Sequence, residues 1–435
     1  MTSVASTTYE LLRRRYRVLG RGSPLLYDRP LHIVRGEGVW LFDADGRRYL
    51  DAYNNVPHVG HCHPKVVEAI ARQAGTLNVH TRYLHEGIVE YAERLVSKFD
   101  PELSMVILAC TGSEANEIAL RMARLCTGNR GILCTSSAYH GNTAAVAKVS
   151  PFIPPPGGHG PDVRLVTPPD SYRGQRTADG ALRPQVWLDA IQSACDSLRA
   201  SGRGVAGMVF DTIFSSEGLP MLTAEFVAGA ADIVRRAGGL YIADEVQPGF
   251  GRTGGHMWGY ELYGVVPDIV TLGKPMANGH PVSGVVARAS LANEFAEKVM
   301  YFNTFGGNPV SCAAASAVLD VLESERLQQN ARDVGSYTIA GLERLASKHD
   351  IVGDVRGRGL FFGVELVTDP VAKTPAEQAT KCVVNAMRER GVLISRTGPR
   401  GNVLKIRPPM PFSRENSDLL LSTLDDVLES QRHGK

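Results

Sequence analysis

The sequence has little of what membrane, secreted or metal-binding proteins require. No apolar run approaches the roughly 18 residues of a membrane-spanning helix, and Met1 to Gly20 contains no apolar core of the secretory type. The seven cysteines are scattered without a CxxC pair, which argues against a disulfide framework and a zinc site. We therefore expect a cytoplasmic protein that neither binds a membrane nor carries a metal.

An excess of charge of one sign is also missing. The formal net charge is +2 and 21% of the residues are charged, as in ordinary soluble globular proteins. The three arginines at Arg13, Arg14 and Arg15 are expected on the solvated face of an N-terminal helix and not on a phosphate-binding patch. Nucleic acid is therefore not an expected partner.

The length of 435 residues exceeds what one hydrophobic core usually supports, so a large domain with a smaller companion is expected. Short apolar runs alternate with helical periodicity, as in strands covered on both faces by crossover helices. These runs are Met105 to Ala109, Ile132 to Cys134, Val205 to Phe210, Leu240 to Ala243, Ile269 to Leu272 and Val282 to Ala287. They predict an α/β domain with a mainly parallel sheet.

The domain boundaries follow from the same patterns. Residues 1–70, with a hairpin within 31–53, are expected to join the small domain, 71–320 to form the large domain and 321–435 to form a small α+β domain. Helices are predicted at Pro64 to Ala74, Glu86 to Phe99, Glu117 to Leu125 and Thr374 to Arg390. The segments 151–161 and 168–180 are predicted to be irregular loops.

Two predicted strands end in residues that suit cofactor chemistry. Asp244 follows Leu240 to Ala243, and Lys274 follows the strand that ends at Leu272. Alone, such an aspartate is more often a cap and such a lysine a surface residue. Together they match pyridoxal phosphate (PLP), which needs an amine for a Schiff base and a carboxylate for its pyridine nitrogen.

Two further segments add to this pair. Thr111, Gly112 and Ser113 connect a strand to a helix, whose first amides and nearby hydroxyls suit a phosphate dianion; an ordinary N-cap is the alternative. Tyr139 follows the next strand, where its ring can stack on a cofactor, although loop aromatics usually serve packing.

The order of these segments, phosphate loop, aromatic, aspartate and lysine, resembles the class III aminotransferases of PLP fold type I, an aspartate aminotransferase-like fold. The resemblance extends from Gly38 to about Ser413. It implies that Lys274 forms the Schiff base, Asp244 binds the pyridinium and Tyr139 stacks on the ring. It also implies that Gly112 and Ser113 hold the cofactor phosphate.

The resemblance implies two more cofactor contacts. Gln247 is implied to reach the ring hydroxyl, and Thr304 to contact the cofactor phosphate of the neighbouring subunit. The active site would then lie at a homodimer interface, with a tetramer of such dimers as the alternative.

Within the family, the sequence is more similar to the phospho-lyases that act on ethanolamine phosphate and phosphohydroxylysine. The segments that carry this similarity are 54–64, 273–281, 301–312 and 402–410. It implies a small amino phosphate as substrate, with elimination of phosphate in place of amino transfer.

Two substitutions weaken the aminotransferase interpretation. Lys405 stands where aminotransferases of this class carry an arginine that grips the substrate carboxylate through a two-pronged hydrogen bond. Asp211 stands where they usually carry a glutamate. A class III omega-aminotransferase nevertheless remains the main alternative, and a non-enzymatic PLP-fold protein is the second.

For the substrate phosphate the sequence offers Arg82, helped by Asn55 or His58, together with Lys405. Arg82 in a structural ion pair is the alternative. His61 and His63 flank Cys62 without a matching acid or cysteine cluster and are interpreted as structural residues. Gly353 to Gly359 precedes a strand, so this segment does not meet the context of a dinucleotide loop.

Overall fold

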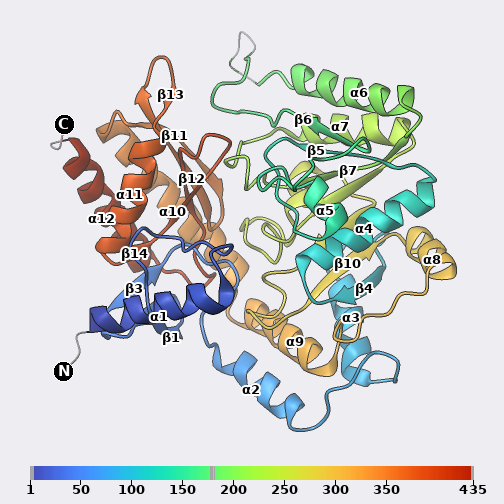
Figure 1. Cartoon of the computed structure of the whole chain (residues 1–435), viewed down its shortest axis with the longest axis horizontal. Coiled ribbons are helices and arrows are strands. Elements are labelled where there is room, and N and C mark those ends of the chain that lie inside the picture. Colours follow the sequence, from blue (N-terminus) through green and yellow to red (C-terminus); the bar gives the residue numbers. More distant parts are fainter. Residues whose placement is uncertain (1–3, 177–179, 181, 433–435) are drawn as a thin grey trace.

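The computed structural model describes residues 4–176, 180 and 182–432. In Figure 1 the large sheet and the helices that cover it occupy the right half of the view. A smaller, mainly C-terminal part occupies the left half. This confirms the predicted α/β fold of type I, with a mainly parallel large sheet and a smaller α+β part. No helix of the described chain is both long enough and apolar enough to cross a bilayer.

The large sheet has seven strands in the order β4-β10-β9-β8-β7-β5-β6. Strands β6, β5, β7, β8 and β9 pair in parallel, while β10 runs antiparallel to β9 and β4. The bounds are β4 Met105–Ala109, β5 Gly131–Thr135, β6 Val163–Val166, β7 Val205–Asp211, β8 Leu240–Asp244, β9 Ile269–Leu272 and β10 Ser283–Ala287. The carboxyl ends of the parallel strands therefore share one edge, where α/β sheets bind ligands.

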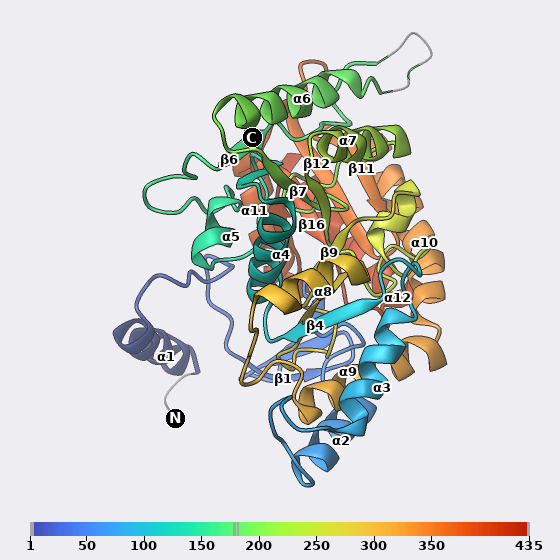
Figure 2. The same ribbon diagram turned by 90° about the vertical axis from the view of Figure 1, so that its right-hand side faces the viewer.

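Helices cover both faces of this sheet, which explains the nearly continuous apolar runs. On one face, α4 packs against Ile132, Val209 and Ile242; on the other, α6 and α7 pack against Met208 and Tyr241. Figure 2 shows α4 and α8 in front of the strands. The bounds are α4 Gly112–Thr127, α5 Ala144–Lys148, α6 Gln185–Ala200, α7 Ala224–Arg236 and α8 Ala289–Lys298, with the 3-10 helix η1 at Gly259–Tyr263.

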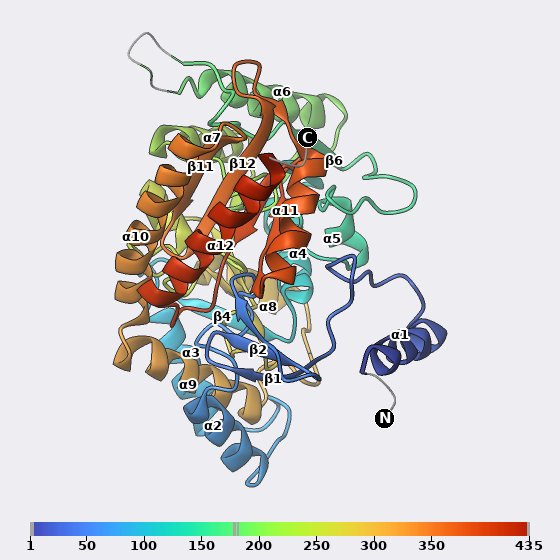
Figure 3. The same ribbon diagram turned by 90° about the vertical axis from the view of Figure 1, so that its left-hand side faces the viewer.

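The smaller part contains a five-stranded antiparallel sheet, in which β13 pairs with β12 beside the row β11-β12-β16-β15. Helices α10, α11 and α12 cover it (Figure 3). The strands are β11 Val352–Arg358, β12 Phe361–Asp369, β13 Thr374–Pro375, β15 Ser395–Thr397 and β16 Val403–Ile406. The helices are α10 Leu327–Lys348, α11 Glu377–Glu389 and α12 Arg414–Arg432.

The N-terminal strands belong to a separate four-stranded sheet, in which β3 pairs in parallel with β14. Its strands are β1 Ile33–Glu37, β2 Trp40–Asp43, β3 Arg48–Asp51 and β14 Val392–Leu393. Helices α2 (Pro64–Ala74) and α3 (Glu86–Val96) pack against α9 (Pro309–Ser324). Helix α1 (Val4–Leu19) stands apart from the body in Figures 2 and 3.

Most predicted elements agree with the structure, and the differences have local causes. Helix α2 has the predicted bounds, whereas the helix predicted from Thr374 begins at Glu377 because β13 occupies the preceding residues. The short strand β6 was not predicted. The predicted loop 168–180 contains residues 177–179, which lie outside the described chain.

Candidate active site

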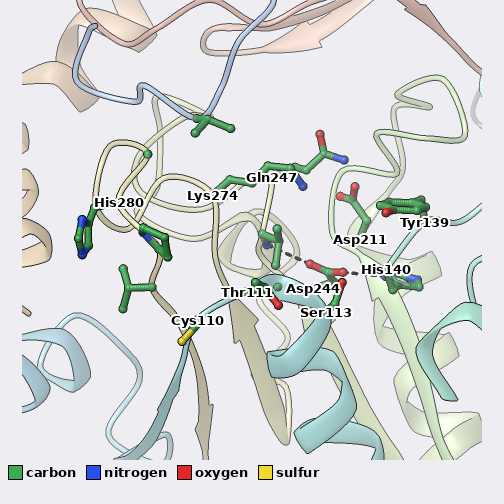
Figure 4. A pocket seen from close by; sticks show the side chains of 17 residues that line it. Cys110, Thr111, Ser113, Tyr139, His140, Asp211, Asp244, Gln247, Lys274 and His280 are labelled. Carbon is green, nitrogen blue, oxygen red and sulfur yellow. Dashed lines mark hydrogen bonds and ion pairs between the residues drawn. The ribbon is translucent and has the colours of Figure 1, made fainter. Parts of the chain in front are cut away.

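Three neighbouring strand ends bring the predicted catalytic side chains together. In the sheet register Asp211 pairs with Asp244, and Asp244 pairs with Thr271; Lys274 follows the end of β9 by two residues. A cavity of about 340 Å³ opens at this edge (Figure 4). Its lining includes the predicted residues Thr111, Gly112, Ser113, Tyr139, Asp244, Gln247 and Lys274.

The carboxylate of Asp244 is fixed by three donors. His140 Nδ1 donates to Oδ2 at 2.7 Å, Asn116 Nδ2 donates to Oδ2 at 3.0 Å, and the backbone N–H of Val246 donates to Oδ1 at 3.0 Å. Burial by itself lowers the pKa of His140, but the hydrogen bond and charge of Asp244 outweigh it, so the pKa is raised. The buried carboxylate thus has one fixed orientation.

Asn116 is itself held in place, because Thr271 Oγ1 donates to its Oδ1 at 2.9 Å. Sequence reasoning did not find Asn116, which lies inside α4, and it named His140 only as the neighbour of Tyr139. Both residues contact Asp244 across more than a hundred positions of the chain.

The amine of Lys274 lies in surroundings that favour its neutral form. Burial is the largest cause that lowers its pKa, and the positive charge of Arg407 lowers it further; Asp244 and Asp211 oppose this only partly. A neutral amine is the form that attacks an aldehyde or accepts a proton. Asp211 has a raised pKa because of burial and the charge of Asp244.

The phosphate-loop segment forms the start of α4. This helix begins at Gly112, so the predicted start at Glu117 is wrong; the reason is a capping box in which Thr111 Oγ1 accepts from the Glu114 N–H and Glu114 Oε2 accepts from the Thr111 N–H. The amides of Gly112 and Ser113 belong to the first turn and have no partner within the helix. They remain available for an anion, which the helix dipole favours.

These residues fit PLP in shape as well as in chemistry. His140 Nε2 is buried and has no partner among the described residues, so one polar atom beside Asp244 remains unsatisfied. Gly141 has φ +137°, and a Cβ there would meet Ser113 Oγ at 2.4 Å; a Cβ on Gly112 would meet the Val246 side chain at 3.2 Å. A side chain at Gly112 or Gly141 would therefore crowd its neighbours in the cavity. An amine, a carboxylate, free amides and an aromatic ring line the same cavity.

A second, larger cavity of about 690 Å³ shares Lys274, Tyr139 and Gln247 with the first. Lys405 lines this cavity, and so does Arg407, which sequence reasoning missed. Arg407 Nε donates to the Tyr53 carbonyl at 3.0 Å, and its Nη1 donates to Gln247 Oε1. The sequence does contain a signal for Arg407, because it lies two positions after Lys405 and residues two apart on an extended segment point to the same face.

Arg82 and Thr304 lie outside these cavities on the exposed surface. The Arg82 guanidinium carbon lies 3.9 Å from the centroid of the Phe302 ring. The segment that contains Arg82 therefore lies next to the segment that contains Phe302 and Thr304. Within the described chain Arg82 has no acidic partner, so the ion-pair alternative has no support there.

His58 and Asn55 are buried and differ in what they offer. His58 Nε2 donates to the Phe250 carbonyl at 2.8 Å, and its Nδ1 accepts from Arg252 Nη2 at 3.2 Å. Burial and the charge of Arg252 lower the pKa of His58 well below its usual value. No ring nitrogen of His58 is left for a substrate phosphate. Asn55 Nδ2, by contrast, is buried without a partner among the described residues.

The two histidines considered for metal binding have acid partners of their own. His61 Nε2 lies 2.7 Å from Asp51 Oδ2, and His63 Nε2 lies 3.0 Å from Glu325 Oε1. The two histidines therefore make separate structural contacts.

Known proteins resemble the chain over almost its whole length. The profile of aminotransferase class III matches residues 26–428. A Drosophila melanogaster alanine–glyoxylate aminotransferase 2-like protein is 45% identical over 95% of this chain and 85% of its own. A Caenorhabditis elegans ethanolamine-phosphate phospho-lyase homologue is 38% identical over 96% of this chain and 93% of its own.

Solved structures give the same result. An Arthrobacter phospholyase, described in complex with phosphoethanolamine, superposes with a TM-score of 0.94 at 50% identity, covering 97% of this chain and 99% of its own. A PLP-bound amine transaminase from an uncultivated Pseudomonas species has a TM-score of 0.84 at 29% identity, covering 94% and 97%. Fold and site thus define a PLP-dependent protein of fold type I. The chain belongs to the aminotransferase class III family.

The fixed carboxylate of Asp244 leads to the first prediction. Asp244→Asn keeps the shape but removes the charge that, on the predicted role of Asp244, would hold a proton on the pyridine nitrogen of PLP, so we expect kcat to fall by about 100-fold or more. Steady-state kinetics and the visible cofactor spectrum measure the effect. Asp162→Asn, at a surface acid paired with Arg203, is the control and should leave kcat unchanged. An Asp244→Asn protein with wild-type kcat contradicts the assignment.

Glu217 beside the site leads to the second prediction. Its Oε1 accepts from Thr135 Oγ1 and its Oε2 is buried without a partner in the described chain; burial, helped by Asp211, raises its pKa from 4.5 to about 7. The folded state therefore holds the extra proton between pH 4.5 and 7, and stability falls as the pH rises through this window.

Glu217→Gln removes this ionisation, so we expect it to stabilise the fold at pH 8 by on the order of 1 to 3 kcal/mol and by much less at pH 5. Urea unfolding at both pH values measures the difference. Glu343→Gln, at an exposed position of α10, should show no such pH dependence. An equal effect of Glu217→Gln at both pH values contradicts the prediction.

Proposed function

We propose that the protein is a PLP-dependent phospho-lyase that eliminates phosphate from a small amino phosphate. With phosphoethanolamine and one water, the products are acetaldehyde, ammonia and phosphate, which balances all atoms. The observation that carries this proposal is Lys405, buried in the cavity of Lys274 at the position where an aminotransferase arginine grips a carboxylate. The similarity to the phosphoethanolamine-bound Arthrobacter phospholyase supports it.

The cofactor residues have separate tasks in this proposal. Bound PLP supplies an electron sink for the carbon that carries the substrate amine. The amides of Gly112 and Ser113, with the hydroxyl of Thr111, would hold its phosphate, and Tyr139 would cover its ring. Asp244 keeps the pyridine nitrogen protonated, and Gln247 serves the ring hydroxyl. Asn116 and His140 act through Asp244 as positioning residues.

Lys274 is the covalent anchor of the cofactor and then the base. The neutral amine of Lys274 would remove the proton from the substrate carbon that bears nitrogen. Its lowered pKa suits this task near neutral pH. The electron pair of that C–H bond forms a double bond to the next carbon, whose C–O bond breaks, and the pair of the C–O bond leaves on the phosphate oxygen. Water then hydrolyses the product enamine to aldehyde and ammonia.

The exposed positions of Arg82 and Thr304 fit a homodimer with shared active sites. In each site Thr304 of the partner subunit would contact the cofactor phosphate, and Arg82 of the partner subunit would contact the substrate phosphate. Arg82 lies over the Phe302 ring, and Thr304 precedes Phe305; these two rings are 40% and 69% exposed in the single chain. Exposed aromatic side chains of this size are frequent at protein interfaces.

A class III omega-aminotransferase is the second candidate. The names of the Drosophila and human relatives favour it, at 45% and 34% identity. Such an enzyme would use the same Lys274 proton transfer but would need an oxo acid to complete each turnover.

The experiment that separates the candidates is product analysis without an oxo acid. We expect phosphoethanolamine to give phosphate, acetaldehyde and ammonia in equal amounts over many turnovers, since elimination regenerates the cofactor. Enzymatic assays for all three products measure this, and a Lys274→Ala protein is the blank. Turnover that requires an oxo acid, with no phosphate released, would establish the aminotransferase.

The third residue-level prediction concerns Arg82. We expect Arg82→Ala to raise KM for phosphoethanolamine by roughly 10-fold or more, since a charge-assisted hydrogen bond is lost. Because the residue acts across the interface, mixed dimers of Arg82→Ala and Lys274→Ala chains should regain activity that neither variant has alone at low substrate. Mixing that restores nothing contradicts the shared site, and an unchanged KM contradicts the role of Arg82.

A further inference from the structure

Two buried cations on one strand face the cavity of Lys274. Lys405 lies in β16 and Arg407 directly follows it, so their side chains share one face of the strand. Each side chain belongs to a residue that is only 7% exposed, and both line the 690 Å³ cavity together with Lys274. The site therefore concentrates positive charge where the substrate must enter.

Neither cation is neutralised by an ion pair within the described chain. The two acceptors that Arg407 uses, the Tyr53 carbonyl and the Gln247 amide oxygen, are both neutral. The Lys405 amine has no hydrogen-bond acceptor among the described residues and lies 5.5 Å from the Phe361 ring centroid. Three acids of the described chain act on this pair without a direct contact: Asp211 on both cations, Glu217 on Lys405 and Asp51 on Arg407. Asp211 already accepts from the backbone N–H groups of Ser215 and Ile213.

Buried charge is costly unless a partner compensates it. The cost is visible in both side chains: burial, followed by the charge of Arg407, lowers the pKa of Lys405 well below its usual value. Burial likewise lowers the pKa of Arg407. A doubly charged anion between the two would relieve both, whereas a carboxylate carries only one charge.

We propose that Arg407 and Lys405 are the substrate-phosphate ligands that the Lys274 chain itself contributes, beside Arg82 of the partner subunit, with Arg407 as the main ligand, and that this pair selects a dianion over a carboxylate. The proposal deepens the proposed function and rests on it. A guanidinium has five N–H donors; two are used by Tyr53 and Gln247, which leaves three. Phosphate oxygens match this fork through paired hydrogen bonds.

The plane of the guanidinium is fixed before a substrate binds. Its carbon lies 4.8 Å from the centroid of the Tyr53 ring and 5.8 Å from that of the Phe361 ring. A guanidinium that is already fixed loses little conformational freedom when the substrate binds. Its N–H donors would then stay directed at the phosphate oxygen that receives the electron pair of the breaking C–O bond. Arg407 also donates to Gln247, the residue proposed to reach the ring hydroxyl of PLP. Gln247 would therefore link the anion site to the cofactor.

The test compares two probes that differ only in their anion. 3-Aminopropylphosphonate replaces the ester oxygen of phosphoethanolamine by a methylene group and cannot lose phosphate, while 4-aminobutyrate is its carboxylate counterpart. Calorimetric titration of the PLP-loaded protein gives the Kd of each. Wild type should bind the phosphonate more tightly. Arg407→Gln should weaken phosphonate binding by roughly 10- to 100-fold and 4-aminobutyrate binding much less.

Arg400→Gln is the matched control, because Arg400 is an exposed arginine seven positions earlier that lines a different cavity. It should leave both Kd values unchanged. Thermal unfolding and the visible cofactor spectrum verify that each variant is folded and loaded. If Arg407→Gln does not fold, Arg407→Lys and Lys405→Met replace it, and both should weaken phosphonate binding selectively.

Unchanged phosphonate affinity in folded, loaded Arg407 and Lys405 variants overturns the inference. Equal losses for both probes also overturn it, since they show a general role in amine binding. The proposed function fails separately, when wild-type protein releases no phosphate from phosphoethanolamine. Steady-state phosphate release then adds a second readout, in which Arg407→Gln should raise KM more than it lowers kcat.

Discussion

The carboxylate of Asp244 is the point on which the arrangement of the site depends. It ends a strand buried on both faces, and its donors come from a helix, a loop and the turn that follows the strand. Moving any of these segments would break a charge-assisted hydrogen bond to a buried carboxylate. The large sheet thus fixes Asp244 and Lys274 relative to each other, because β8 and β9 are paired neighbours.

The two parts of the fold contribute side chains of opposite charge to this site. The large sheet contributes the acids Asp211 and Asp244, while β16 of the smaller sheet contributes Lys405 and is directly followed by Arg407. Arg407 lowers the pKa of Lys274, and Asp244 opposes that effect. The basicity of Lys274 therefore depends on contact between the two parts, and a bound anion that screens Arg407 would raise it.

Sequence patterns predicted the fold class and most elements of the large sheet because each strand is a local apolar run. They also predicted that Asp244 and Lys274 follow the ends of two strands, whereas the pairing of these strands as neighbours came from the structure. They did not predict Asn116 and Arg407, whose partners are distant in the chain. They placed the start of α4 five residues late, because small polar residues were interpreted as a turn although Thr111 and Glu114 form a capping box. The occupied ring nitrogens of His58 also required the structure.

The position of Lys405 and Arg407 relative to Lys274 restricts the length of the substrate. On the proposed function, the substrate amine binds at Lys274 after β9, and its phosphate binds at Lys405 in β16 and at Arg407 directly after that strand. These elements belong to different sheets, each rigidly paired on both sides. Since a strand shifts only together with its neighbours, the separation between the amine and the anion sites is set by how the two sheets pack. A longer amino phosphate would therefore have to bend to reach both sites.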